Sequence, residues 1–249
     1  MTIMYSTLIS TFIFSLLSRM ARDKKYRIIS IFWITLSIVT LIVFSGFRGG
    51  DIGDTGMYMH SYSLYADNPS IATFDRDPGF TILNLILIKI SSNPQTLLIA
   101  TAIIVNLCNI FLFYKYDSYI ELQVYLYITS GYFTITMNGM RQCIAAAILF
   151  TCTYLIIKGK FKLYLLIVLL ISTIHASSLI MIPIYFIVRE EAWSKRVIVM
   201  IIIACVGVVF YNILSPILFK AIENTQYGDY ANFDGGGSSL MRTIVNMVS

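Results

Sequence analysis

The sequence predicts an all-α, polytopic bundle of transmembrane helices, and three observations support this fold class. First, 57% of the 249 residues are hydrophobic and only 12% are charged, whereas soluble domains carry roughly 25% charged residues. Second, several apolar runs approach the roughly 20 residues that a helix needs to cross a bilayer. Third, these runs lack the alternation of apolar and polar residues that is typical of barrel strands. We therefore expect a single integral membrane domain over residues 1–249.

The chain begins with two apolar runs separated by a basic cluster. A cleaved signal peptide begins with basic residues, which the run 1–18 lacks, so we interpret this run as a spanning helix. The sequence RMARDKKYR follows at 19–27, and residues 28–46 form the second run. Because Lys and Arg concentrate on cytoplasmic loops, the basic cluster belongs inside the cell. The polar segment 47–78 is then an external loop.

This external loop contains a helix of its own. In the stretch TGMYMHSYSLY, the residues Tyr58, Tyr62 and Tyr65 recur at helical spacing. Tyrosine is common where a membrane meets water, so we expect a short helix lying in that interface. The next run, 79–90, is too short to span, and we expect it not to cross the membrane.

The later apolar runs are the remaining expected spanning helices. They cover residues 97–114, 119–137, 142–157, 163–188 and 197–219. The basic stretch KGKFK at 158–162 belongs inside, which puts Arg141 at the external face. For 163–188 we prefer a single span to a hairpin broken at His175, because two crossings of about twelve residues are short. The run that begins at Leu240 is also too short to span, so we expect the domain to be incomplete at its C-terminus.

Composition and spacing argue against several classes of function. The net charge of +5 is not arranged as a basic stripe with interleaved aromatic residues, which argues against nucleic acid as a partner. The four cysteines lie in apolar runs without a CxxC pair, and the two histidines lack ligand spacing. We therefore expect neither a disulfide framework nor a metal site. The sequence contains no nucleotide-binding motif, and we expect no cofactor.

Charged residues gather on the expected external face. They are Arg48, Asp51, Asp54, Arg76, Asp77 and Arg141. Charged groups at membrane depth are costly and are therefore candidates for function, although solvated loop charges or ion pairs explain them as well. In FRGGDIGDTGMY, glycines surround Arg48 and Asp54 and allow the backbone to approach a ligand closely.

Two further positions are candidates for chemistry. Arg141 and Gln142 open an alanine-rich run in NGMRQCIAAAILF, and arginine binds phosphate through a rigid fork of donors. The alternative is an arginine that snorkels from a helix end. His175 lies within STIHASS, where it could transfer a proton near neutral pH or be a satisfied buried residue.

The ordered set of motifs resembles the EpsG family of bacterial membrane proteins, which includes Wzy-type polysaccharide and O-antigen polymerases. The motifs are GDTGMY, RDPGFTILN, NGMRQCIAAAI, KGKFK and TIHASSLIMIPIYF. They extend from about residue 47 to residue 185. Two features depart from the family pattern. Asp77, followed by Pro78 and Gly79, stands where a glutamate is more common, and the chain is shorter than typical members.

The resemblance implies a membrane glycosyltransferase with a GT-C-like layout. Such an enzyme sits in the bacterial cytoplasmic (inner) membrane, with its active face periplasmic or extracellular. It joins oligosaccharide repeat units carried on undecaprenyl diphosphate into O-antigen, capsule or exopolysaccharide. An acceptor sugar hydroxyl attacks the anomeric carbon of the donor, and undecaprenyl diphosphate leaves. A chain-length regulator is a candidate partner.

Within this implied reaction, the candidate residues take separate roles. The substrate-binding set consists of Arg48, Arg141, Gln142, Tyr58, Arg76 and Asp77. Of these, Arg141 and Arg48 would face the pyrophosphate, and Tyr58 would stack on a sugar or mark the membrane interface. The base would be Asp54, Asp51 or His175, which the sequence does not rank.

Two other functions stay open at this point. A flippase or transporter for lipid-linked glycans would also need external arginines, but it should show internal repeats, which this sequence lacks. A membrane acyltransferase with His175 as its base is the second alternative. A strain that lacks the protein distinguishes a polymerase from a flippase. Loss of a polymerase leaves single capped repeat units on the cell surface, whereas after loss of a flippase no repeat units are exported.

Overall fold

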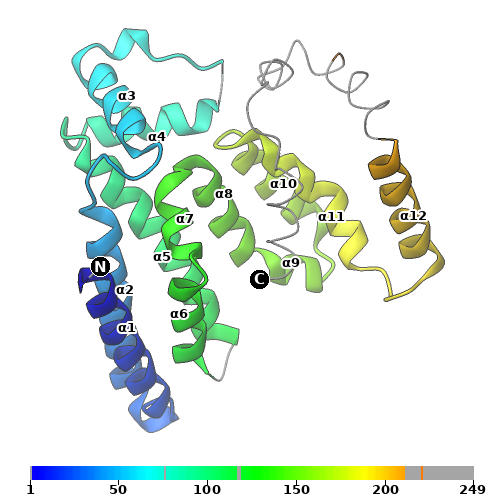
Figure 1. Ribbon diagram of the computed structural model, residues 1–249, viewed down its shortest axis with the longest axis horizontal. Coiled ribbons are helices and arrows are strands. Elements are labelled where there is room, and N and C mark those ends of the chain that lie inside the picture. The colour runs from blue at the N-terminus through cyan, green and yellow to red at the C-terminus, as the bar shows by residue number, and fades with distance from the viewer. Residues whose placement is uncertain (1, 76, 117–118, 211–219, 221–249) are drawn as a thin grey trace. The chain divides into compact units, whose positions relative to one another are not determined.

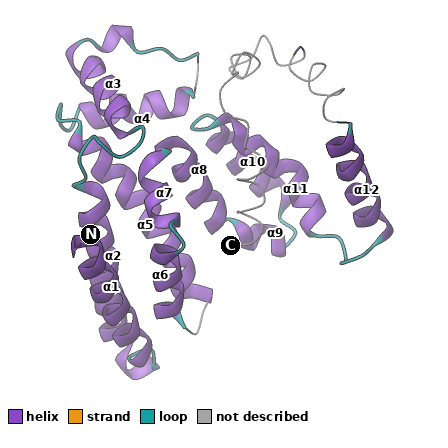
Figure 2. Cartoon of the chain, in the orientation of Figure 1, coloured by secondary structure: helices purple, strands orange, loops and turns teal. Residues whose placement is uncertain are grey.

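The computed structural model describes residues 2–75, 77–116, 119–210 and 220, and every regular element in these segments is a helix (Figure 2). The predicted all-α class is therefore confirmed for this part of the chain. The chain divides into two compact units, Met1–Arg189 and Glu190–Ser249. The prediction of one continuous membrane domain stays a prediction, and each unit is described by itself.

Three helices of the first unit are long and apolar enough to cross a membrane. They are α1 (Thr2–Met20), α2 (Arg27–Gly46) and α5 (Gln95–Tyr116), as Figure 1 shows. Large apolar side chains on their outer faces, such as Phe32 and Phe111, are exposed, as expected where lipid is the solvent. The three spans predicted in these places are confirmed.

Small and polar side chains join these three helices inside the bundle. The hydroxyl oxygens of Ser15 on α1 and Ser37 on α2 lie 3.2 Å apart, and both residues are fully buried. Asn106 on α5 donates its amide Nδ2 to Ser45 Oγ on α2 over 3.1 Å. Small residues let helix backbones approach closely, and hydrogen bonds between side chains replace the hydrophobic force that lipid cannot supply.

Two shorter helices, α3 (Thr55–Asp67) and α4 (Pro78–Ile88), follow α2 in the predicted external loop. The helix predicted there is confirmed, but its tyrosines pack into the protein. Tyr62 is fully buried and donates its hydroxyl to the carbonyl of Ser91 over 2.8 Å. The position of α3 at a membrane surface stays a prediction. The 11 residues of α4 measure about 16 Å, too short for a straight crossing.

Two of the predicted spans are each broken into two helices. The run 119–137 forms α6 (Ile120–Thr129) and α7 (Tyr132–Asn138). Gly131 between them has a φ of +81°, a left-handed conformation that ends a right-handed helix and is easily adopted only by glycine. The sequence TSG at residues 129–131 does not by itself predict the break.

The run 142–157 forms α8 (Met140–Thr151) and α9 (Thr153–Ile157), which meet at Cys152. On either side of Cys152, the hydroxyls of Thr151 and Thr153 donate hydrogen bonds to backbone carbonyls of the preceding turn. Such bonds compete with the helical pattern and commonly bend helices.

The preferred single span over 163–188 is wrong, because the structure has the hairpin instead. It consists of α10 (Phe161–Ser172), the 3-10 helix η3 (Ala176–Ile180) and α11 (Met181–Val188). The two arms are antiparallel. Phe161 at the start of α10 contacts Phe186 near the end of α11, with their ring centroids 5.0 Å apart. His175 is the break point, with an extended backbone at φ −153° and ψ 107°.

The hairpin changes where the segment REEAWSKR begins. Arg189, its first residue, donates Nη1 to the carbonyl of Ile156 over 2.6 Å. Its guanidinium also lies beside Gly159 in the basic stretch KGKFK. The predicted position of this segment, on the face opposite KGKFK, is therefore wrong for its first residue. Arg189 lies on the same side as KGKFK.

The first unit has a basic end and an opposite end with the candidate site. At the basic end, Arg19 pairs with Glu121 at 2.8 Å, and Lys115 lies 5.3 Å from the ring centroid of Tyr154 on α9, close to the Arg189 contact. We call the opposite end the site end, because Arg48, Asp77, Arg141 and His175 lie there. This separation agrees with the predicted topology, although the side of the membrane stays a prediction.

Cysteine labelling tests the hairpin directly. We expect Leu64→Cys on α3 to react with a membrane-impermeant maleimide in intact cells or spheroplasts. Glu191→Cys and Lys158→Cys should react only after permeabilisation, because Arg189 ties the end of the hairpin to the basic end. If Glu191→Cys is labelled from outside while Lys158→Cys is protected, the segment 163–188 crosses the membrane once and the hairpin is wrong.

The second unit contains the described helix α12 (Lys195–Val209), which occupies the first part of the predicted span 197–219. Ser194 caps this helix by accepting a hydrogen bond from the Val197 amide at 3.4 Å. Arg196 pairs with Glu190 at 2.7 Å. The end of the predicted span and the run that begins at Leu240 lie outside the described residues.

Candidate functional site

Arg141 is the centre of a polar cluster at the site end. It lies in the first turn of α8, where Gly139 ends α7 and allows the chain to turn. Its Nη1 lies 2.6 Å from Asp77 Oδ2, and its Nε donates to the Tyr58 hydroxyl over 3.3 Å. The guanidinium also lies 5.7 Å from the Tyr58 ring centroid, within the range of a cation–π contact. One third of the Arg141 side chain stays exposed (33%), so the group is held in place and is still accessible.

Asp77 reaches this cluster through an unusual backbone. It has a φ of +49°, in the left-handed region, directly before Pro78 at the start of α4. Its carboxylate is 5% exposed. While one oxygen binds Arg141, the other accepts a hydrogen bond from the Ala176 amide over 3.2 Å. Asp77 therefore connects α8 with the tip of the hairpin.

Gly79 allows α4 to approach the hairpin tip closely. Its amide donates to the Thr173 carbonyl over 2.8 Å. A Cβ at this position would lie 2.3 Å from Thr173 Oγ1 and 3.0 Å from a backbone atom of the same residue. The motif of Asp77, Pro78 and Gly79 thus supplies partners to backbone groups that the break in the hairpin leaves free, as a membrane interior requires.

Replacing Gly79 tests this contact. We expect Gly79→Ala to lower the stability of the protein by about 1–3 kcal/mol, because an added methyl group overpacks the site. Gly207→Ala on α12 is the matched control, since a Cβ there meets nothing within 4 Å. The measurement is thermal unfolding in detergent, followed with a thiol-reactive dye at the buried Cys143 and Cys152. Equal melting temperatures for the two variants would contradict the close approach.

His175 lies beside Arg141 and Asp77 at the hairpin tip, outside the apolar helices. It is half-buried, and burial lowers the pKa of its imidazole below the usual value. The negative charge of Asp77 opposes this shift, whereas the positive charge of Arg141 adds to it. The imidazole is therefore neutral at neutral pH, the form that can accept a proton.

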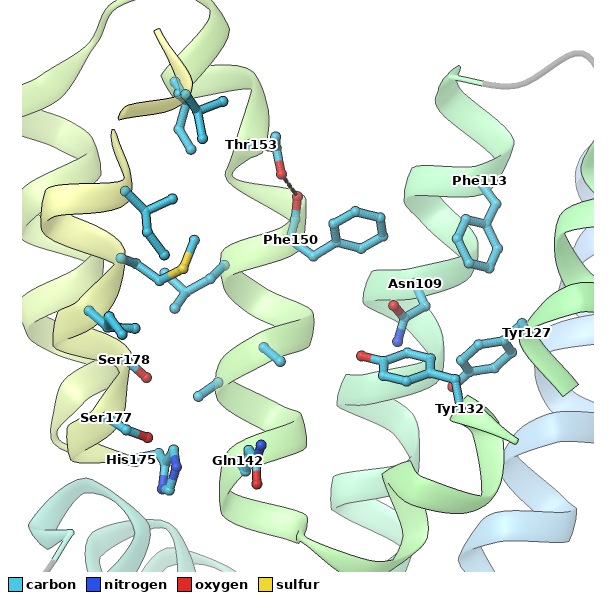
Figure 3. A pocket seen from close by; sticks show the side chains of 18 of the residues that line it. Asn109, Phe113, Tyr127, Tyr132, Gln142, Phe150, Thr153, His175, Ser177 and Ser178 are labelled. Atoms are coloured by element: carbon cyan, nitrogen blue, oxygen red, sulfur yellow. Dashed lines mark hydrogen bonds between the residues drawn. The ribbon is translucent and has the colours of Figure 1, made fainter. Parts of the chain in front are cut away.

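An apolar groove of about 1040 Å³ begins beside this cluster. Figure 3 shows His175 and Gln142 together at one end of the groove, and Phe150 and Thr153 towards the other. The groove follows one face of α8 and α9 between α5, α6 and α7 on one side and η3 and α11 on the other. Polar side chains along it include Asn109, Tyr132 and Ser178 (Figure 3).

Arg48 lies elsewhere at the site end and binds protein groups. Its Nε donates to Thr55 Oγ1 over 3.3 Å, and its Nη1 donates to the carbonyl of Ser45. The residue is 7% exposed, and burial lowers the pKa of its guanidinium to about 10. Arg48 thus stays charged at neutral pH, and within the described segments its hydrogen bonds go to Thr55 and Ser45, not to Arg141 or Asp77.

The remaining candidates are less constrained by the structure. Asp51 and Asp54 are exposed, and among the described residues neither carboxylate has a hydrogen bond or an ion pair. The Asp54 backbone amide, however, donates to Asn138 Oδ1 over 2.8 Å. Arg76 lies outside the described residues. The structure therefore groups Arg141, Asp77, Tyr58, His175 and Gln142, and the predicted roles of all the candidate residues stay predictions.

Three residues at the site end were not singled out by the sequence. Thr55 joins Arg48 to α7 by donating to the Met137 carbonyl over 3.2 Å, Asn138 binds the Asp54 amide, and Thr173 accepts the Gly79 amide. All three lie within the quoted motifs, GDTGMY, NGMRQCIAAAI and TIHASSLIMIPIYF, but their residue types are common in loops and did not distinguish them from their neighbours. The signal that could have found them is proximity to a candidate residue, because Thr55 follows Asp54, Asn138 precedes Arg141 by three positions and Thr173 precedes His175 by two.

Comparison with known proteins agrees with the motif order. The family model described as the EpsG family matches residues 31–249. The chain is 25% identical over 207 residues to the amylovoran biosynthesis protein AmsC of Erwinia amylovora. That alignment covers 78% of this chain and 55% of the relative, so the chain spans about half the length of the protein it matches. No solved structure matches the chain.

Proposed function

Because the chain belongs to the EpsG family, which its match over residues 31–249 establishes, we propose that it is a membrane glycosyltransferase that polymerises lipid-linked oligosaccharides. The repeat units are carried on undecaprenyl diphosphate, and the product is a surface polysaccharide. The name of the relative, an amylovoran biosynthesis protein, supports a role in polysaccharide biosynthesis. The proposed reaction requires a group that binds diphosphate and a group that accepts a proton.

The single observation that carries this proposal is the cluster of Arg141, Asp77, Tyr58 and His175. In the reaction, an acceptor hydroxyl attacks the anomeric carbon, and the bond from that carbon to the diphosphate oxygen breaks. The electron pair leaves with the lipid diphosphate, so negative charge builds up on the leaving group. A positioned, partly exposed guanidinium such as that of Arg141 stabilises this charge.

The proton of the acceptor hydroxyl passes to a base, for which we propose His175. Its imidazole is neutral at neutral pH because burial lowers its pKa, and its neighbours at the site end are Asp77 and Arg141. Asp77 is the weaker choice, because its two oxygens are occupied by Arg141 and the Ala176 amide. Asp54 and Asp51 remain alternatives, since their exposed carboxylates are free to reach a substrate.

The apolar groove supports a lipid-linked substrate. It begins at Gln142 and His175 and continues along the faces of α8 and α9 with a mainly apolar lining. A donor with its diphosphate at Arg141 could lay its lipid chain along this surface. The bacterial cytoplasmic membrane, with the site end facing outward, is the proposed location, because the opposite end is basic. A chain-length regulator remains a proposed partner.

Reconstitution tests the proposal. The purified protein in lipid vesicles is supplied with an undecaprenyl-diphosphate-linked repeat unit, and the products are separated on a gel. A ladder of polymers and release of lipid diphosphate are the expected results. Movement of the unaltered donor across the bilayer, without a ladder, would establish a flippase, and acyl transfer to the glycan would establish the acyltransferase alternative.

A further inference from the structure

The first external loop is attached to the end of α7 by two neighbouring hydrogen bonds. Thr55 donates its hydroxyl to the Met137 carbonyl over 3.2 Å, and the Asp54 amide donates to Asn138 Oδ1 over 2.8 Å. The Thr55 hydroxyl also accepts a hydrogen bond from Arg48 Nε at 3.3 Å. We refer to Arg48, Thr55 and Asn138 together as the loop latch.

Gly53 shows how closely the loop and α7 approach each other. It has a φ of +51°, and a Cβ there would lie 2.0 Å from Asn138 Oδ1. Both the left-handed backbone and the short distance require glycine at this position. The contact is therefore close-packed.

Arg48 ties the latch to α2 at a cost in stability. It binds the carbonyl of Ser45 in the last turn of α2 and the hydroxyl of Thr55 at the start of α3. The residue is 7% exposed, no described carboxylate pairs with it, and its Nη2 is buried without a partner among the described residues. A buried charge without a partner is unfavourable, and an apolar side chain would stabilise a membrane protein better. We therefore attribute the presence of Arg48 to the way it positions Ser45 and Thr55, and not to a contribution to the stability of the fold.

The two segments joined by the latch carry the two residues that meet at the candidate site. Tyr58 follows Thr55 by three residues, about one turn of α3, and Arg141 follows Asn138 by three residues across the start of α8. Their side chains meet through the bond from Arg141 Nε to the Tyr58 hydroxyl at 3.3 Å. A shift of α3 relative to α7 would therefore move Tyr58 away from Arg141.

We propose that Arg48, Thr55 and Asn138 are positioning residues, which hold Tyr58 against Arg141 and so fix the Arg141 guanidinium for catalysis. The part of this inference that concerns catalysis rests on the proposed function. Positioning of a catalytic group matters steeply, because a misplacement of about 1 Å can cost on the order of a hundredfold in rate. Arg48 thus acts through its neighbours and needs no contact with substrate.

Thr55 offers the sharpest substitution. Thr55→Val keeps the shape but removes the hydroxyl that accepts from Arg48 and donates to Met137. We expect kcat for polymerisation to fall about tenfold, at unchanged protein level, and Thr55→Ser to restore it. Thr40→Val is the matched control on α2, because the Thr40 hydroxyl, within the described part of the chain, bonds only to the Leu36 carbonyl of its own helix. Full activity of Thr55→Val would overturn the proposal.

A double-mutant cycle tests whether the latch acts through Tyr58. Tyr58→Phe removes the hydroxyl that meets Arg141, and it is combined with Thr55→Val. If the latch acts by placing Tyr58, the double variant should be no slower than the slower single variant. Effects that multiply would show two independent contributions and would contradict the proposed route.

A distance measurement tests the geometry without relying on any reaction. Spin labels are placed at the exposed positions Leu64 on α3 and Ile135 on α7, in a protein whose Cys108 and Cys205 are replaced by alanine. We expect a narrow distance distribution, which Thr55→Val broadens and Thr55→Ser restores.

The two kinds of measurement separate the possible failures. An unchanged distribution in Thr55→Val would refute the latch. A broadened distribution with unchanged kcat would refute its role in catalysis. A broadened distribution in a protein that never polymerises would leave the latch intact and refute the proposed function.

Discussion

Replacing Arg141 with alanine should abolish polymer synthesis in cells, and replacing it with lysine should leave a small residue of activity. The Arg141 guanidinium is held by Asp77 at 2.6 Å and by the Tyr58 hydroxyl at 3.3 Å. Loss of a positioned donor that faces developing negative charge costs on the order of 3 kcal/mol, or roughly a hundredfold in rate. Lysine keeps the charge but cannot bind Asp77, Tyr58 and a phosphate oxygen with one planar fork.

The glycan ladder is read beside an immunoblot, because Arg141 also matters for folding. Removing it leaves the buried carboxylate of Asp77 without a cation, and breaking a buried pair costs about 3–5 kcal/mol. Arg141 is one-third exposed, which reduces this cost, and the Arg141→Lys variant retains a cation. Arg196→Ala is the control, because that side chain is 79% exposed and, among the described residues, pairs only with Glu190. A normal ladder from Arg141→Ala would show that Arg141 does not bind the diphosphate, and Arg48 would become the candidate for that role.

The apolar runs predicted where helices form, but they did not predict where helices break. Residues 119–137 form one apolar run that continues through Gly131, and the left-handed φ of this glycine becomes visible only in the structure. Each arm of the hairpin at His175 is short for a bilayer, so length alone favours a single span. The bonds of Asp77 and Gly79 to the hairpin tip stabilise that break, and such contacts between distant segments are not encoded in local periodicity.

The same limit applies to the candidate site. The residue types and their motifs identified Arg141, Asp77, Tyr58 and His175, because charged or ionisable groups beside apolar runs are unusual. Their pairing was not predictable, since Asp77 and Arg141 are separated by 64 positions and come together only when α4 docks on the hairpin. The predicted phosphate-binding role of Arg48 stays a prediction, and its contacts with a carbonyl and a hydroxyl were not predictable from the sequence.

Replacing His175 with glutamine should reduce polymerisation by about 10²–10⁴-fold, the usual contribution of a general base. Glutamine retains a similar volume and hydrogen-bonding capacity, but it cannot accept a proton near neutral pH. His60→Gln is the matched control, because His60 lies exposed on α3. Both proteins should insert normally and reach the same level. A full ladder from His175→Gln would assign the base to Asp54 or Asp51.

The pH dependence of activity distinguishes a base from a structural histidine. Burial and the positive charge of Arg141 lower the pKa of His175, while Asp77 raises it. The rate should therefore rise with pH through a pKa lower than the usual histidine value and then level off, since only the neutral imidazole accepts a proton. In Asp77→Asn the opposing negative charge is lost, so the pKa should fall further and the acid limb of any remaining activity should move to lower pH. An acid limb that does not move in Asp77→Asn, or that persists in His175→Gln, would mean that another group accepts the proton.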